Sequence, residues 1–150
     1  MNQAHKTDDN TLAESKPLVR QSMAHLRLRK HSDYQRAYAN SRKRQSASMS
    51  WFLAPQDPAG SPSTPRIGLT AGKVLGKAHD RTRIKRRMRE ALRRHTNLFP
   101  VGCDLILHPR RTVLTMEFAK LEAEILRILE QAKAEAGRIT LKTAEVKPTQ

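Results

Sequence analysis

The sequence predicts a single small α+β domain, in the order α-β-β-α-β-α, with helices packed on a three-stranded sheet. Apolar residues recur at helical spacing in three segments, and three short segments between or before these helices have the alternating or continuous apolar character of strands. The chain has 150 residues, enough for one compact domain with tails but not for two large domains.

The first helix is predicted over about residues 32–39. Tyr34, Ala37 and Tyr38 are spaced i, i+3, i+4, which gives this helix one aromatic face. Ser32 stands in front of them and is a candidate N-cap, because a serine hydroxyl can accept a hydrogen bond from a free backbone N–H of the first turn.

Two strands follow. In residues 49–54, Met, Trp and Leu alternate with Ser, Phe and Ala, so Phe52 is predicted on the opposite face of the strand from Trp51. The stretch PQDPAGSPSTP, residues 55–65, holds four of the eight prolines and is predicted to be an exposed loop. The next segment, RIGLTAG, is predicted to be the second strand.

The predicted second helix, residues 78–95, combines charge with periodicity. Its stretch DRTRIKRRMREALRR has eight Arg and Lys in fifteen residues. Its apolar residues form one stripe at spacing i, i+4, i+7, i+8: Ile84, Met88, Ala91 and Leu92. A disordered basic arm or a targeting tag needs no periodicity. This pattern therefore predicts a helix that packs one side on the sheet and exposes a cationic surface elsewhere.

The last two elements are a strand, CDLILH, that ends at Pro109, and a helix over about residues 115–136. Thr115 is the candidate cap at the start of this helix, and Gly137 suits its end. Cys103 is the single cysteine, and its apolar neighbours predict a buried structural thiol. Asp104, inside the same strand, is expected to pair with an arginine and not to act as a base.

The tails have no periodicity that could bury them. Residues 1–24 are predicted to be disordered and residues 138–150 to be a flexible tail, which leaves a domain over residues 25–137. The N-terminus has acidic residues and no apolar core of a signal peptide, and a lone cysteine forms no internal disulfide. We therefore expect the protein in the cytoplasm, without a membrane-spanning segment.

The formal net charge of +15 indicates a phosphate polymer as partner. On the predicted second helix, Arg81, Lys85 and Arg89 form a row roughly 12 Å long. RNA is a better candidate than DNA, because the sequence has no paired Cys/His finger, no evident helix-turn-helix and no heptads that continue this helix. The candidate contacts to RNA phosphates are Arg81, Arg83, Lys85, Arg86, Arg89 and Arg93.

The stretch RIGLTAGKVLGKAHDRTRIKRRMREALRR resembles the signature region of the bacterial ribonuclease P protein family, in which a Lys and a Gly precede an Arg-Asn-Arg-x-Lys-Arg-x-x-Arg helix. The matching residues are Lys73, Gly76, Arg81, Arg83, Lys85, Arg86 and Arg89. RLRKHSDYQRAY is similar to the family's first helix and CDLILHPRR to its third strand, so the resemblance covers residues 26–134. Thr82 departs from the usual Asn, and Pro109 from the usual small residue.

The resemblance implies a protein that binds a large catalytic RNA and helps it remove the 5′ leader of precursor tRNA. It implies that the basic helix contacts the catalytic RNA and that a cleft between the first helix and the sheet holds the leader. Mg²⁺ would be held by the RNA and the substrate, so no catalytic or metal-binding side chain is expected in the protein. The scattered histidines agree with that expectation, since none are paired at metal-ligand spacing.

The candidate leader-binding residues are Tyr34, Tyr38, Phe52 and Lys73. The aromatic rings could stack unpaired bases, or they could simply cover the sheet as core residues. Lys73 could approach a phosphate, or it could be a solvated surface lysine. At the level of function, the alternative is a structural RNA-binding protein such as a small ribosomal protein, which composition alone does not separate from the ribonuclease P reading. A DNA-binding regulator fits the sequence less well.

Overall fold

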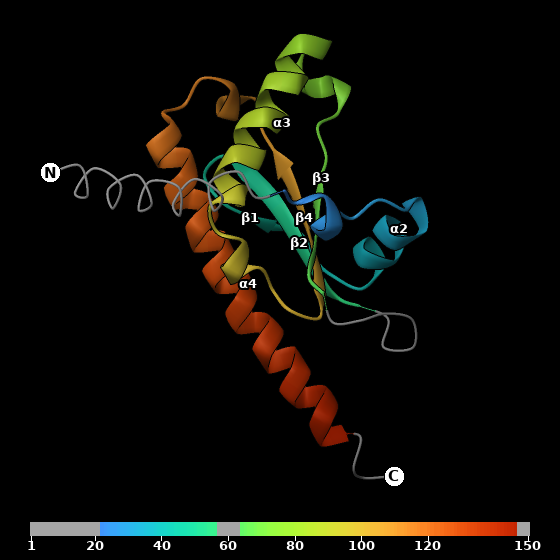
Figure 1. The fold of residues 1–150 in the computed structure, drawn as a ribbon. Helices are drawn as coiled ribbons and strands as arrows, with labels where there is room; N and C mark the ends of the chain where they lie inside the picture. Colours follow the sequence, from blue (N-terminus) through green and yellow to red (C-terminus); the bar gives the residue numbers. More distant parts are fainter. Residues whose placement is uncertain (1–21, 57–63, 147–150) are drawn as a thin grey trace, which may run out of the picture.

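A computed structural model describes residues 22–56 and 64–146. The helices and strands lie in one α+β domain, as predicted (Figure 1). The main elements, in chain order, are α2 (His31–Ala39), β1 (Arg44–Gln45), β2 (Met49–Pro55), β3 (Arg66–Leu69), α3 (Ala78–Arg93), β4 (Cys103–Pro109) and α4 (Phe118–Val146). Short 3₁₀ turns connect them: Ala24–Leu26, Lys73–Leu75, Thr96–Leu98 and Arg111–Leu114.

The sheet has four strands and not the three that were predicted, in the order β1-β2-β4-β3. Strands β1 and β2, and β2 and β4, pair antiparallel, while β3 and β4 pair parallel. The missed strand, β1, is two polar residues long, and it exists because Arg44 and Gln45 pair with β2. No apolar alternation accompanies such a strand, so the sequence gives no signal for it.

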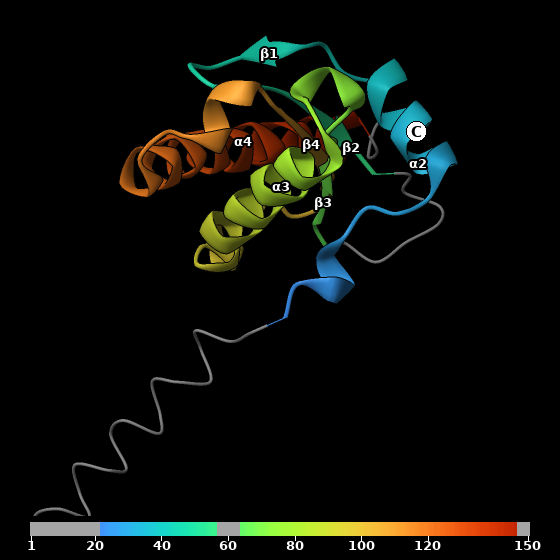
Figure 2. The same cartoon turned by 90° about the horizontal axis from the view of Figure 1, so that it is seen from above.

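One face of the sheet carries the main hydrophobic core. Met49, Trp51 and Leu53 of β2 lie on this face, as the alternation predicted, and helices α3 and α4 cover it (Figure 2). The predicted stripe of α3 is buried against it: Ile84, Met88, Ala91 and Leu92 are at most 1% exposed. Cys103 is also buried, as predicted, and burial raises the pKa of its thiol to about 11, so it is uncharged at neutral pH.

Helix α2 covers the opposite face of the sheet. The apolar cluster beneath it is small, and its buried members are Leu28, Ala37, Ala54 and Ile106. Phe52 lies at the margin of this cluster, on the other side of β2 from Trp51, as predicted. The helix begins at His31 with Lys30 as its N-cap and no side-chain cap bond, so the predicted cap at Ser32 is wrong.

Helix α4 differs from its prediction at both ends. It begins at Phe118, and Thr115 instead ends the preceding 3₁₀ turn, so it does not cap α4. The helix also continues through Gly137 to Val146, so residues 138–146 belong to it and are not a flexible tail. A helical glycine costs about 1 kcal/mol relative to alanine. Packing of Ile139 against the core helps to offset that cost.

Three expectations concern residues that the structure does not describe. The predictions for residues 1–21, 57–63 and 147–150 lie outside the described part. Residues 22–24 were predicted to belong to the disordered tail, which is wrong, because Met23 packs against the core and Ala24 begins a 3₁₀ turn. The loop predicted over residues 55–65 begins later than expected, because Pro55 ends β2 and Gln56 is buried. Within the described part, no helix is long and apolar enough to cross a membrane.

Candidate nucleic-acid interface

The basic residues of helix α3 and its C-cap Arg94 form two groups, one that contacts α4 and one that does not. On the side toward α4, the Arg87 guanidinium donates a hydrogen bond to the Met116 carbonyl and lies 6.0 Å from the centre of the Phe118 ring. Arg94 lies 5.1 Å from the same ring and 3.4 Å from a carboxylate oxygen of Glu122. These two arginines therefore help to attach α4 to α3, a role that depends on a long-range contact and that the sequence did not reveal.

The predicted RNA-contacting residues occupy the rest of the helix surface. Arg83 and Arg86 are exposed, and Arg81, Lys85, Arg89 and Arg93 are half-buried. Arg81 donates a hydrogen bond to the Gly76 carbonyl at 3.3 Å, and Arg93 pairs with Glu90 at 2.8 Å.

The remaining four cations have no side-chain hydrogen bond or ion pair with another described residue: Arg83, Lys85, Arg86 and Arg89. Like charges so close on one helix repel each other, and only Glu90 and Asp80 offset them within it. An anionic partner would relieve this repulsion, and guanidinium groups suit phosphate oxygens in particular.

The second surface is an aromatic cluster between α2 and the sheet. Tyr38 stands edge-on to Phe52, with ring centres 5.0 Å apart, and Tyr34 is 6.4 Å from Tyr38. His108 of β4 joins them: its ring is 5.3 Å from Phe52, and its Nε2 is hydrogen-bonded to the Tyr38 hydroxyl at 2.8 Å. The sequence did not single out His108, because it lies 70 residues away from Tyr38 in the chain.

The cluster is packed and also accessible. Tyr38 is 36% exposed, whereas Tyr34 and Phe52 are half-buried against the small apolar cluster. Burial is the main reason why the pKa of the Tyr34 hydroxyl is raised. Burial, and to a smaller extent the charge of Lys43, lowers the pKa of His108, which keeps the imidazole neutral at pH 7. The imidazole is therefore an uncharged member of this aromatic cluster.

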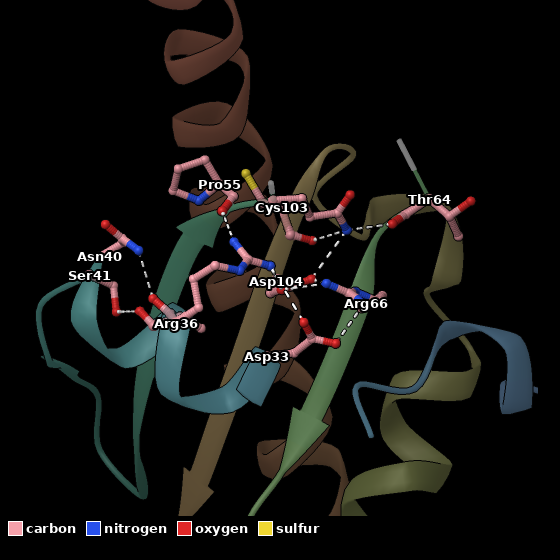
Figure 3. A network of polar contacts seen from close by, with 11 residues as sticks. Asp33, Arg36, Asn40, Ser41, Pro55, Thr64, Arg66, Cys103 and Asp104 are labelled. Carbon is pink, nitrogen blue, oxygen red and sulfur yellow. Dashed lines mark hydrogen bonds and ion pairs between the residues drawn. The ribbon is translucent and has the colours of Figure 1, made fainter. Parts of the chain in front are cut away.

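An ion network around the buried Asp104 fixes α2 on the sheet (Figure 3). Asp104 is fully buried and accepts two hydrogen bonds of 2.9 Å from the Arg66 guanidinium. Arg66 also donates to Asp33 of α2 at 3.1 Å, and Arg36 of α2 lies 3.6 Å from Asp104. The expectation that Asp104 pairs with arginine is confirmed, and the pKa of Arg66 is raised mainly by that hydrogen bond.

Gly68 makes the close approach of α2 possible. A Cβ atom at this position would lie 2.8 Å from the Tyr34 hydroxyl oxygen and 2.9 Å from two carbons of its ring. Tyr34 therefore occupies the space that a side chain on β3 would need. The ion network and this glycine together determine where the aromatic residues of α2 stand relative to the sheet.

Lys73 lies apart from the aromatic cluster. It is exposed in the 3₁₀ turn after β3, and that turn contacts α3. Its side chain has no hydrogen bond or ion pair with another described residue. The structure thus brings three of the four predicted leader-binding residues together and places Lys73 beside the N-terminus of the basic helix.

Comparison with known proteins identifies one family throughout. The family model for ribonuclease P matches residues 23–133. A ribonuclease P protein component from Chloroflexus aggregans is 34% identical over 124 residues, which is 82% of this chain and 89% of that protein. One from Thermobifida fusca is 27% identical over 122 residues, 78% of this chain and 82% of that protein.

Solved structures show the same fold. The RNase P protein from Staphylococcus aureus superposes with a TM-score of 0.61 at 24% identity, over 72% of this chain and 95% of that one. The RNase P protein from Thermotoga maritima superposes with a TM-score of 0.60 at 23% identity, over 70% of this chain and 96% of that one.

Proposed function

The chain belongs to the ribonuclease P protein family and is a protein component of that endoribonuclease, and we propose how its two surfaces divide the work. The family match also decides between the readings that composition left open, because it favours ribonuclease P over a small ribosomal protein. In our proposal, helix α3 binds the catalytic RNA, and the aromatic cluster under α2 binds the 5′ leader of precursor tRNA.

The observation that carries the first assignment is the set of cations on α3 that have no ion pair with another described residue. Arg83, Lys85, Arg86 and Arg89 project from a helix whose other side is anchored in the core. A rigid row of charges on a docked helix can follow an RNA backbone by shape and phosphate spacing. Arg81 and Arg93 complete the surface, although each already has one partner within the protein.

The aromatic cluster supports the second assignment. Tyr34, Tyr38 and Phe52 lie beside one another, and a single-stranded leader has unpaired bases that such rings can stack on. Lys73, at the far end of β3, would meet a phosphate only if the bound strand continues from the cluster toward α3.

We assign the hydrolytic chemistry to Mg²⁺ held by the RNA and the substrate. The described residues contain no group of three or more His, Cys, Asp or Glu that could hold a metal ion. Their two buried carboxylates have protein donors instead: Asp104 binds Arg66, and Glu124 binds Ser46 and Ser48. The protein's own residues would therefore act by binding and orienting RNA.

Reconstitution tests the proposal as a whole. The protein is added to the catalytic RNA and precursor tRNA at low Mg²⁺, where we expect it to stimulate removal of the leader. If the helix makes about six phosphate contacts, the logarithm of the RNA-binding constant should fall with the logarithm of salt concentration with a slope of about −4 to −5. A nearly flat salt dependence contradicts the assignment of α3.

Two sets of variants then separate the surfaces. Arg86→Gln should weaken binding of the catalytic RNA by about 1–2 kcal/mol, as expected for a lost charge-assisted contact. Tyr38→Ala should leave that binding nearly unchanged and weaken binding of precursor tRNA by about 1–3 kcal/mol, but not of mature tRNA. Tyr38→Phe is the matched control, because it keeps the ring and removes only the bond to His108. An unchanged ratio of precursor to mature affinity in Tyr38→Ala would show that the cluster is only packing.

A further inference from the structure

A cavity of about 430 Å³ lies at the edge of the sheet, between strand β3, the end of α3 and residues 22–28. A parallel bridge between Arg27 and Ile67 holds the N-terminal segment beside β3, and the Leu28 N–H donates to the Ile67 carbonyl at 2.9 Å. The cavity walls are both polar and apolar. Four residues that line the cavity form its apolar part: Leu26, Ile67, Leu92 and Phe99.

Two arginines without acidic partners line this cavity. Arg27 comes from the N-terminal segment and Arg89 from α3, and neither has a side-chain hydrogen bond or ion pair with another described residue. Their proximity has an electrostatic cost: burial and then the charge of Arg27 lower the pKa of Arg89. Arg93, which lines the same cavity, differs because it is paired with Glu90. Two cations thus face one cavity, and none of the described residues that line it is acidic.

We propose that this cavity binds a single nucleoside 5′-monophosphate unit, with the phosphate between Arg27 and Arg89 and the base against the apolar wall. The volume is within the roughly 300–1,000 Å³ typical of small-ligand sites. Two guanidinium groups supply forked donors that match phosphate oxygens, and a phosphate there removes the repulsion between them. Inorganic phosphate has no group that packs against the apolar part of the wall, whereas a nucleotide has its base. The site should therefore bind a nucleotide more tightly than inorganic phosphate.

The cavity adjoins the aromatic cluster at Tyr34 and extends away from it. Of the four residues assigned to the leader, only Tyr34 borders the cavity, and Tyr38, Phe52 and Lys73 do not. The bound unit can be a free nucleotide or one nucleotide of an RNA strand, since both offer the same phosphate and base. The inference rests on the geometry of the cavity and stands whether or not the surfaces divide the RNAs as proposed above.

The test is calorimetric titration of the RNA-free, full-length protein with AMP and with UMP. We expect saturable binding at one site, and binding at least about tenfold weaker for adenosine and for inorganic phosphate, each of which lacks half of the ligand. Arg27→Gln and Arg89→Gln should each weaken nucleotide binding by about tenfold or more, the scale of one lost charge-assisted hydrogen bond. Arg138→Gln is the matched control, because Arg138 is exposed on α4 and does not line the cavity.

Several results decide the proposal. The proposal is wrong if inorganic phosphate and AMP bind with equal affinity, or if no saturable binding is seen. It is also wrong if both arginine variants keep the parental melting curve and bind AMP as tightly as the parent. Repeating the titration with the catalytic RNA bound identifies the source of the ligand. If AMP no longer binds to the complex, a nucleotide of the RNA occupies the site. If AMP still binds, the ligand is a free nucleotide. Both results presuppose that the site exists. Leader cleavage by the reconstituted complex is measured separately, so a failure of the proposed function is not confused with failure of this site.

Discussion

The two faces of the sheet are held by different forces. The face toward α3 and α4 is a continuous apolar core that includes Trp51, Leu105 and Leu129. The face toward α2 has only a few buried apolar residues and is fixed by the ion network around Asp104. Stability from apolar area is not directional, whereas charged hydrogen bonds require particular atoms at particular distances.

This difference indicates a division of labour. The apolar face supplies the free energy that keeps the domain folded and holds the basic helix as a rigid support. The polar face positions α2, and with it Tyr34 and Tyr38, without contributing much apolar burial. We therefore expect changes on the first face to affect stability first, and changes on the second face to affect leader recognition at a smaller cost in stability.

The largest expected effect is on the apolar face. Trp51→Ala should destabilise the domain by about 3–5 kcal/mol, because a fully buried aromatic ring is lost and a cavity remains. Urea unfolding followed by circular dichroism measures the change, and Trp51→Phe should retain more than half of the stability that the alanine variant loses. A loss under about 1 kcal/mol in Trp51→Ala would mean that this face is not the main core.

A smaller loss is expected when the ion network is broken. Asp104→Asn should cost about 2–3 kcal/mol, because Arg66 loses its buried charged partner. This loss of stability is smaller than the largest values for breaking a fully buried ion pair. The reason is that the Arg66 side chain is 24% exposed, so water can reach it. The same variant should lower the ratio of precursor to mature tRNA affinity, since α2 is less well fixed. If stability falls and that ratio stays at the parental value, the network does not position the aromatic residues.

Next in size is the close packing of Tyr34 on the sheet. Gly68→Ala should cost about 1–3 kcal/mol, because the new Cβ overlaps the Tyr34 ring and the ring must move. Gly72→Ala is the matched control, since no atom lies within 4 Å of a Cβ there. Thermal melting of both variants, followed by precursor tRNA binding, measures the two effects. Equal melting temperatures for the two variants would show that the Tyr34 contact is dispensable.

The smallest expected effect is on pH dependence. The pKa of His108 is lowered in the folded protein, so folding disfavours the charged imidazole. At a pH between the folded and the ordinary value of 6.5, the unfolded chain binds more protons, so stability falls as pH drops below about 6.5. His108→Gln should reduce this slope when unfolding is measured from pH 7.5 to 5.5. A slope equal to that of the parent would assign the pH dependence to other groups.

The amino-acid sequence by itself determined those features that depend on local periodicity and charge. The alternation around Trp51 placed a strand and its two faces, and the stripe from Ile84 to Leu92 placed the basic helix and its buried side. Both patterns lie within a single element, because the spacing of its apolar residues alone decides which side of a helix or strand is buried. The signature residues on that helix also identified the family.

Only the tertiary structure decided how distant segments meet. Contacts between residues far apart in the chain account for four features that the sequence did not reveal. These are strand β1, the extension of α4 beyond Gly137, the pairing of His108 with Tyr38 and the attachment of α4 through Arg87. The sequence pattern marks Asp104 as unusual but does not show that Asp33 and Arg36 meet it. The physical reason is that periodicity reports which side of an element is apolar, whereas pairing between elements depends on the position of both in space.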